Sequence, residues 1–247
     1  MYTSIKAVAI RTVKHNDRSS ILNAWSPSLG RLSIVMPSGN GAESRRRRAL
    51  TMPLCMFECE ADVRPNSEFL VVRDMRRWSP DGRAKDVSAH PVRSAVAMFV
   101  AEVLGVVTRE GDGDNVLWQL IVDTVSNLSD GNGAVLANLP VMFLLQLAST
   151  MGIAPDMSDW KKGYGLDKAE GVICATRPMH DMWVSPDRMR VLSVVLAASR
   201  AYAHAAAVRL PRKVRAELLD ETIDYFTIHH FPLDRMRSLQ ILKNIFD

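Results

Sequence analysis

Residues 54–63, LCMFECEADV, form the most regular pattern in the chain and decide how its first third folds. Apolar or small residues at Cys55, Phe57, Cys59, Ala61 and Val63 alternate with Met56, Glu58, Glu60 and Asp62. Successive side chains of a strand point to opposite faces, so this period of two gives one apolar and one acidic face. The stretch predicts a half-buried β-strand.

Shorter runs of the same kind lie on both sides of this stretch. In residues 18–26, RSSILNAWS, Ile21 and Trp25 share one face, while Leu22 and Ala24 share the other. Residues 31–38, RLSIVMPS, alternate in the same way, and residues 69–78, FLVVRDMRRW, predict a further strand. Roughly five such strands predict a small closed barrel of the oligonucleotide-binding (OB) type, which we assign to residues 1–80.

Beyond a polar connector at residues 79–91, SPDGRAKDVSAHP, the apolar period changes from two to about 3.6, as in amphipathic helices. Helical patterns cover residues 92–107, 117–128, 143–151 and 187–205, a long segment from residue 211, and residues 238–246. Residues 156–186 are irregular. The prediction is an α+β protein: an N-terminal five-stranded OB-fold barrel, then an all-α C-terminal domain over residues 81–247.

The charge of the chain is unevenly placed. The formal net charge is +4, but residues 1–77 hold thirteen cations against seven acids, and the rest of the chain holds 18 cations against 20 acids. Four adjacent arginines stand in residues 41–53, GAESRRRRALTMP, which we expect to form a loop. Alone, such a run is as well explained by a solvated loop; on a basic barrel it favours a polyanion partner such as nucleic acid.

The predicted DNA-binding residues are therefore the cations of the barrel together with one aromatic platform for a base. They are Lys14, Arg18, Arg31, Arg45, Arg46, Arg47, Arg48, Arg73, Arg76, Arg77 and Trp25. Arginine suits this role because its planar guanidinium can donate two parallel hydrogen bonds to a phosphate. The acidic face of residues 58–62 is expected to be solvated and to repel phosphate, so the DNA path should lie elsewhere on the barrel.

The sequence offers little support for an enzyme or for a metal site. The α-carbons of Cys55 and Cys59 would lie about 13 Å apart on one strand, too far for a disulfide or for one tetrahedral zinc ion. Cys174 stands alone, and no glycine-rich phosphate loop of the GxxxxGK[ST] type occurs. We expect no catalysis, no cofactor and no metal. Without a signal peptide or a long apolar run, a cytoplasmic protein that acts at the nucleoid is expected.

The order of these parts resembles the RecO family of bacterial recombination mediators over essentially the full chain. The resemblance is carried by residues 7–39, with Gly30 and Arg31 at a turn, by 49–54, ALTMPL, by 68–76, EFLVVRDMR, and by 216–246, where Ser238, Leu239 and Leu242 match a Lys-Ser-Leu-x-x-Leu pattern. One departure is clear: many members bind zinc through four cysteines, and the corresponding residues 154–178 keep only Cys174. The resemblance therefore implies a member without the metal.

The resemblance also implies function and partners. It implies binding to single- and double-stranded DNA, annealing of complementary strands, and help in loading RecA onto DNA coated with single-stranded DNA-binding protein. The implied partners are RecR and the acidic, apolar C-terminal tail of the single-stranded DNA-binding protein; no membrane is involved. Candidate cations for that tail are Lys161, Lys162, Arg177, Arg188 and Arg190. The alternatives are an interaction scaffold with no direct DNA role and a nuclease with dispersed acidic ligands.

Overall fold

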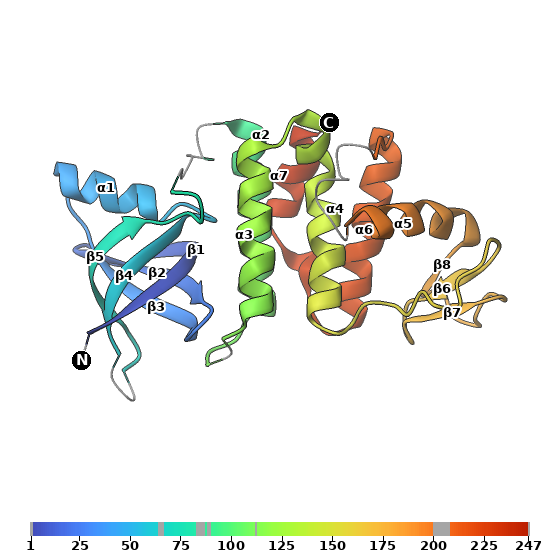
Figure 1. Cartoon of the computed structure of the whole chain (residues 1–247), viewed down its shortest axis with the longest axis horizontal. Helices are drawn as coiled ribbons and strands as arrows, with labels where there is room; N and C mark the ends of the chain where they lie inside the picture. Colours follow the sequence, from blue (N-terminus) through green and yellow to red (C-terminus); the bar gives the residue numbers. More distant parts are fainter. Residues whose placement is uncertain are drawn as a thin grey trace. The chain divides into compact units, whose positions relative to one another are not determined.

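The computed structural model describes residues 2–63, 67–82, 87, 90–111, 113–199 and 208–246. These residues group into two compact units, Met1–Val125 and Ser126–Asp247, and each unit is described by itself. Figure 1 labels the helices and strands along the chain. The predicted boundary near residue 80 falls in the connector, where residues 83–86 and 88–89 lie outside the described part, and it stays a prediction.

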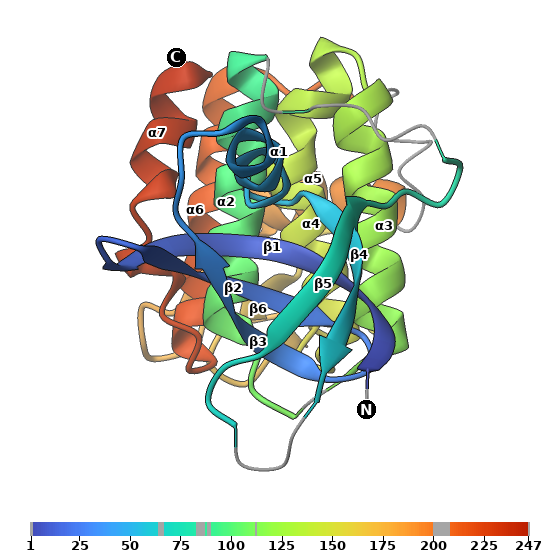
Figure 2. The same cartoon turned by 90° about the vertical axis from the view of Figure 1, so that its left-hand side faces the viewer.

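The first unit is built on a five-stranded antiparallel sheet in the order β3-β2-β1-β4-β5 (Figure 2). The strands are β1 (Tyr2–Asn16), β2 (Ser19–Ser26), β3 (Gly30–Pro37), β4 (Met56–Asp62) and β5 (Val71–Arg77), with helix α1 (Ala42–Leu50) between β3 and β4. The two outer strands approach through one parallel bridge between Ile34 and Leu70. The α+β prediction is confirmed, but the predicted closed barrel is a partly open one, as OB-folds are.

Among the described core residues of this sheet, Phe57 is the one aromatic side chain, and several of its neighbours are small. Phe57 on β4 is fully buried, and its direct neighbour on β1 is Ala7. The strand partners Ala9 and Ala24 are also fully buried, as is Ala61. Small residues around one phenylalanine let a five-stranded sheet curl tightly without overfilling its core.

Cys59 on β4 and Cys55 just before it do not form the disulfide that their predicted separation excluded. Cys55 and Cys59 are buried, and neither forms a disulfide. Burial raises the pKa of the Cys59 thiol to about 12, because the charged thiolate is poorly solvated there. Cys59 is therefore an unreactive core residue, and Cys55 belongs to the same buried cluster.

Two helices follow where apolar periodicity predicted them: α2 (Pro91–Val107) in the first unit, and α3 (Asn115–Asp130), which begins in the first unit and runs past its last residue, Val125. Helix α2 packs on the outer face of β1, and Gly105 permits the close approach: a β-carbon there would lie 3.3 Å from Cγ2 of Ile10. Trp118 on α3 contacts Trp25 on β2, with ring centroids 6.4 Å apart. These helices bury part of the outer face of the sheet.

The second unit is mainly helical, in the predicted order: α4 (Gly133–Thr150), α5 (Pro186–Ser199), α6 (Arg212–Ile228), a short 3-10 turn at Leu233–Arg235, and α7 (Ser238–Ile245). The Asn132 side chain caps α4 by accepting hydrogen bonds from the backbone of Ala134 and Val135. Of the described helices, only α4 is long and apolar enough to cross a membrane, and 72% of it is buried within the structure, as in a core helix.

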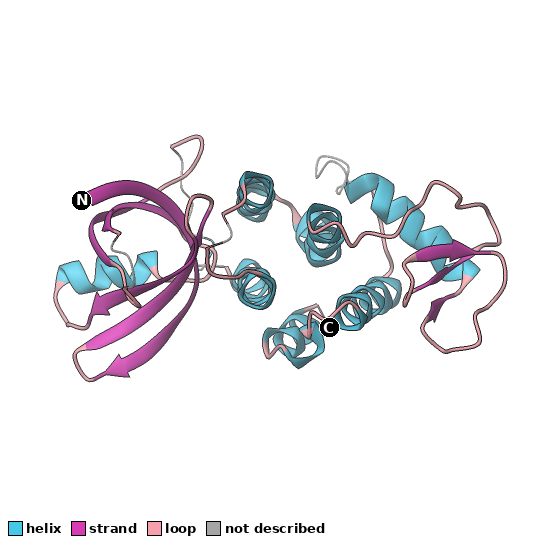
Figure 3. Ribbon diagram, turned by 90° about the horizontal axis from the view of Figure 1, so that it is seen from below, coloured by secondary structure: helices cyan, strands magenta, loops and turns pink. Residues whose placement is uncertain are grey.

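The irregular residues 156–186 contain a small antiparallel sheet that the sequence did not predict. Its strands are β6 (Gly165–Asp167), β7 (Val172–Cys174) and β8 (Trp183–Val184), in the order β7-β6-β8. Figure 3 draws these short strands in magenta. The predicted all-α domain thus carries a β insertion. Three strands of two or three residues bury too little to hold this segment in place by themselves.

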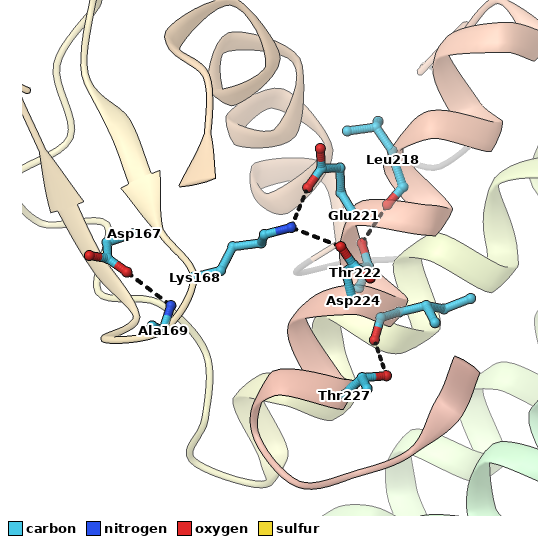
Figure 4. A network of polar contacts seen from close by, with 9 residues as sticks. Asp167, Lys168, Ala169, Leu218, Glu221, Thr222, Asp224 and Thr227 are labelled. Atoms are coloured by element: carbon cyan, nitrogen blue, oxygen red, sulfur yellow. Dashed lines mark hydrogen bonds and ion pairs between the residues drawn. The ribbon is translucent and has the colours of Figure 1, made fainter. Parts of the chain in front are cut away.

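A buried lysine ties the small sheet to α6 (Figure 4). The Lys168 ammonium donates to Glu221 at 3.1 Å and to Asp224 at 3.0 Å, while its side chain is only 7% exposed. Burial opposes the charged form, but the two carboxylates outweigh it and raise the pKa of Lys168. The backbone carbonyl of Lys168 also contacts the His229 ring at the C-terminal end of α6.

We predict that Lys168→Met lowers the free energy of unfolding by roughly 1–3 kcal/mol, because two carboxylates lose their shared partner. A raised pKa in the folded state means that this stabilisation is fully present below the ordinary lysine pKa and is lost as pH rises through the folded value. In urea titrations, the wild type should therefore have a higher free energy of unfolding than Lys168→Met at neutral pH, and this difference should shrink above about pH 10.5. An advantage that stays constant to higher pH would contradict the ion-pair account.

Candidate nucleic-acid interface

The four adjacent arginines lie on helix α1, not on the predicted loop. Arginine and alanine are good helix formers, and consecutive side chains are separated by about 100° around the helix, which keeps the four cations apart. Glu43 in the first turn and Arg47 and Arg48 in the last turn suit the helix dipole. Leu50 is buried and anchors the helix on the barrel.

A groove of about 690 Å³ runs between α1, the end of β3 and β5, and we call it the α1–β5 groove. It is lined by Val35, Met36, Pro37, Glu43, Arg46, Arg47 and residues 71–76. Figure 2 faces this part of the first unit, with α1 above β5. Of the arginines predicted for DNA binding, the groove gathers Arg46 and Arg47 from α1 with Arg73 and Arg76 from β5.

A β-bulge brings the two β5 arginines to one face of the strand. Arg73 lies opposite Glu60 and Arg76 opposite Glu58, so two residues of β5 fill the space opposite one residue of β4. In a regular strand, positions three apart point to opposite faces. The extra residue in the bulge shifts the alternation of side chains by one position, so Arg73 and Arg76 point to the same face. Asp74, within the bulge, adopts a left-handed φ of 49°. Asp74 is therefore the position that aligns both arginines.

The groove cations already have acidic or aromatic neighbours. Arg47 pairs with Glu43 at 3.2 Å and Arg76 with Glu58 at 2.7 Å. The Arg73 guanidinium lies 4.4 Å from the centroid of the Tyr2 ring. These contacts are exposed, and exposed ion pairs stabilise a fold by about 0–1 kcal/mol, so a phosphate can replace a carboxylate at little cost. With Glu43 and Asp74, the lining holds four cations and two acids.

The remaining predicted cations are dispersed. Arg45 and Arg48 are exposed on α1 but do not line the groove. Lys14 and Arg18 lie at the exposed end of the β1–β2 hairpin, where Lys14 pairs with Asp17 at 2.8 Å. The Arg18 carbonyl accepts a hydrogen bond from Ser38, which directly follows the groove residue Pro37, so the hairpin flanks the groove.

Three other predicted residues do not fit a DNA contact. Trp25 is fully buried against Trp118, so the prediction that it stacks on a base is wrong for this structure. The Arg31 guanidinium donates to the backbone carbonyl of Gly105 on α2, and burial lowers its pKa, so it serves the fold. Arg77 lies opposite the buried Phe57, on the other face from the aligned pair Arg73 and Arg76.

On the acidic face of β4, each glutamate has a cation opposite it on a neighbouring strand, and we call this arrangement the charge ladder. Glu58 stands between Lys6 on β1 and Arg76 on β5, and Glu60 stands opposite Arg73. Opposite charges directly across a sheet stabilise the pairing. The predicted repulsion of phosphate by this face is therefore weakened by the flanking cations.

The cations predicted for a protein partner do not gather in the second unit. Lys161, Lys162 and Arg190 are exposed. Arg177 pairs with Asp181 at 2.7 Å, and Arg188 pairs with Glu217. No described feature brings these five residues to one cavity.

Sequence reasoning missed a cavity of about 210 Å³ between α4, α6 and α7. Its wall is apolar, with Pro140, Val141, Leu219, Leu242 and Phe246, and its basic members are Arg212, Arg215 and Lys243. Arg215 lies 5.5 Å from the Phe246 ring, and burial together with Arg212 lowers its pKa. The available signal was Arg212, Arg215 and Leu219, which recur at helical spacing.

The described part of the chain contains no group of three or more histidine, cysteine, aspartate or glutamate side chains that could hold a metal ion. Cys174, at the end of β7, has no second cysteine near it in sequence.

Comparison with known proteins gives a consistent result over the whole chain. The family model described as "Recombination protein O C terminal" matches residues 89–239. Proteins named DNA repair protein RecO are similar at full length: that of Phocaeicola vulgatus is 24% identical over 97% of both chains, and that of Bacteroides fragilis is 26% identical over 97% of both. The one from Porphyromonas gingivalis is 26% identical over 98% of both chains.

The left-handed φ of Asp74 predicts different effects of two substitutions there on the free energy of unfolding. Glycine adopts left-handed φ without a steric penalty, so Asp74→Gly should leave the free energy of unfolding unchanged or raise it by up to about 1 kcal/mol. Asp74→Ile should lower it by about 1–3 kcal/mol, because a β-branched residue is strained there. Urea denaturation monitored by tryptophan fluorescence measures both. Equal losses for the two variants would show that backbone conformation is not the constraint.

Proposed function

The chain belongs to the RecO family of DNA repair proteins, and on that premise we propose that it is a non-catalytic mediator of recombinational repair. In this proposal the first unit binds single- and double-stranded DNA and anneals complementary strands. The protein also helps to load RecA onto DNA coated with single-stranded DNA-binding protein. RecR remains a predicted partner, without an assigned site.

The observation that carries the proposal is the gathering of Arg46, Arg47, Arg73 and Arg76 around one groove of about 690 Å³. Each phosphate neutralised by such a cation releases condensed counterions, which makes binding favourable and salt-dependent. Because guanidinium groups can replace those counterions, two strands held by the protein repel each other less. Lower repulsion between complementary strands is what annealing requires.

We predict that Arg46→Ala/Arg47→Ala makes the log–log salt slope for single-stranded DNA shallower by about 1.4, since each phosphate contact contributes about 0.7. Annealing of complementary oligonucleotides should slow in parallel. Fluorescence anisotropy at several salt concentrations between about 50 and 200 mM measures the slope, a range chosen for its large expected change in affinity.

The matched control is Arg45→Ala/Arg48→Ala, which removes the same charge from the same helix at positions that do not line the groove. This variant should keep the wild-type slope. Equal effects of the two double variants would mean that total charge matters and the groove does not. If neither variant changes DNA binding, an interaction scaffold with no direct DNA role becomes the better account.

For the second unit, we infer that the cavity between α4, α6 and α7 binds the acidic, apolar tail of the single-stranded DNA-binding protein. The apolar wall, with Leu219 and Leu242, suits a terminal apolar side chain. Arg212, Arg215 and Lys243 supply cations for the carboxylates of such a tail. Lys243 already pairs with one carboxylate, that of Asp220, at 2.6 Å.

We predict that Arg212→Ala/Lys243→Ala weakens binding of a tail peptide by roughly 5- to 30-fold, the effect of losing two ion pairs of about 0.5–1 kcal/mol each. Isothermal titration calorimetry measures it. The control Lys161→Ala/Lys162→Ala removes the same charge from two of the cations first predicted for this role and should bind normally. A larger loss in the control would place the tail at those lysines and reject the cavity.

A further inference from the structure

The second unit contains a small hollow on a different side of α6 from the cavity near Arg215. The hollow has a volume of about 30 Å³ and lies between the small sheet and helices α4, α5 and α6. Leu219 and Asp220 line the cavity, whereas Thr222 and Tyr225 line the hollow, and these two pairs point to different sides of a helix with 3.6 residues per turn. We call this second space the α5–α6 hollow.

The wall of the α5–α6 hollow is almost entirely apolar. Two of its polar groups are bonded within the protein: the Thr222 hydroxyl donates to the Leu218 carbonyl at 2.7 Å, and the Tyr225 hydroxyl donates to the Ile153 carbonyl at 2.6 Å. A ligand therefore meets mainly apolar side chains, which are Leu145, Ala148, Ala154, Pro155, Leu166, Val184, Leu192 and Leu196.

The size of the hollow limits what can enter it. Its 30 Å³ holds about two water-sized spheres, whereas pockets for cofactors and other small molecules measure roughly 300–1,000 Å³. A nucleotide does not fit. The branched end of one aliphatic side chain does, and a single buried side chain of this kind is a common anchor of protein–protein interfaces.

Negative charge exceeds positive charge at the rim of the hollow. Lys168 and Glu221 line it, and the Lys168 ammonium is shared between Glu221 and Asp224 (Figure 4). Asp156 comes directly after the loop residues of the wall and is exposed. Hydrogen bonds from Ser158 lower the pKa of Asp156, so this carboxylate stays charged at neutral pH. The rim thus holds three carboxylates and one ammonium.

The next charges along the two helices do not change this balance. Arg188 on α5 pairs with Glu217 on α6, one helical turn before Leu192 and Glu221, and the pair is neutral as a whole. The Asp224 side chain is 66% exposed and so remains accessible to a second cation. An apolar hollow beside an excess of carboxylates is complementary to an aliphatic side chain with cations next to it.

We propose that the α5–α6 hollow is a docking site for a partner protein, which inserts one aliphatic side chain from a segment that carries arginine or lysine beside it. This inference goes beyond the proposed function, because it uses neither the α1–β5 groove nor the cavity near Arg215. The two sites of the second unit then select opposite charges: the cavity takes an acidic segment, and the hollow takes a basic one.

The test titrates the full chain with an acetylated and amidated peptide, Gly-Ser-Arg-Leu-Arg-Ser-Gly, and follows backbone amide shifts by nuclear magnetic resonance. Amides of α5 and α6 around Leu192 and Thr222 should shift and saturate with a Kd on the order of 1 mM. A peptide with serine in place of leucine should bind roughly 10- to 100-fold more weakly, because the anchor is lost. A Glu-Leu-Glu version should also bind more weakly, because its carboxylates meet those of the rim.

Two substitutions in the protein test the hollow and its rim separately. Ala154→Leu fills the hollow and should weaken binding at least roughly 10-fold, with an unchanged or higher free energy of unfolding. Asp224→Asn keeps the shape of the rim and should weaken binding roughly 2- to 5-fold. The control Asp159→Asn makes the same charge change at an exposed acid that does not line the hollow and should bind normally.

Four results would overturn the proposal. They are the absence of saturable shifts, equal binding of the leucine and serine peptides, wild-type affinity of Ala154→Leu, and tighter binding of the Glu-Leu-Glu peptide, which would assign the hollow to an acidic partner. Self-association of the protein that Ala154→Leu abolishes would assign it to a second copy of the chain. Should Ala154→Leu fail to fold, the peptides and Asp224→Asn still decide.

Failure here is separable from failure of the proposed function. Arg46→Ala/Arg47→Ala and Arg212→Ala/Lys243→Ala should both bind the basic peptide like the wild type, whatever they do to DNA or to the acidic tail.

Discussion

Strand β4 has one apolar face and one charged face, and the first unit depends on this division. Phe57 fills the interior opposite alanine, and this leaves no room for a second large residue at the neighbouring inner positions. The inner positions of β1 and β2 are accordingly small or aliphatic, and the outer positions that α2 and α3 do not cover are available for charge. The charge ladder and the arginine groove both occupy outer positions or edges that this packing leaves free.

Bulges then decide which side chains share an outer face. Between Ala9 and Arg11 a register shift lets β1 bury Ile10 under α2 and still expose Arg11 beside Asn23. On β5, the shift at Asp74 aligns two arginines that a regular strand would separate. A single inserted residue costs one ladder hydrogen bond and about 1–3 kcal/mol of strain when it is not glycine. The strain of such a bulge is tolerated when the side chains that it aligns form a functional surface.

The pattern of residues 54–63 was enough to predict β4, because alternation is a local property. The helix of Arg45 to Arg48 was missed because its one buried residue, Leu50, gives no apolar period. Trp25 was misjudged for a non-local reason: its cover, Trp118, comes more than 90 residues later, and no sequence pattern pairs the two. The cavity near Arg215 likewise needs three helices to meet. Residues that act locally were predictable; those defined by a distant partner were not.

Two of the groove arginines, Arg47 and Arg76, each have a carboxylate partner. This pairing bears on how such a site would work. Binding DNA exchanges one exposed ion pair for another, so the net gain comes chiefly from counterions released by the nucleic acid and only slightly from new Coulomb energy. In the proposed function, affinity for DNA is then moderate and falls steeply with salt. The strand annealing that we propose needs that reversibility, whereas four unpaired arginines would hold the strand more tightly and release it more slowly.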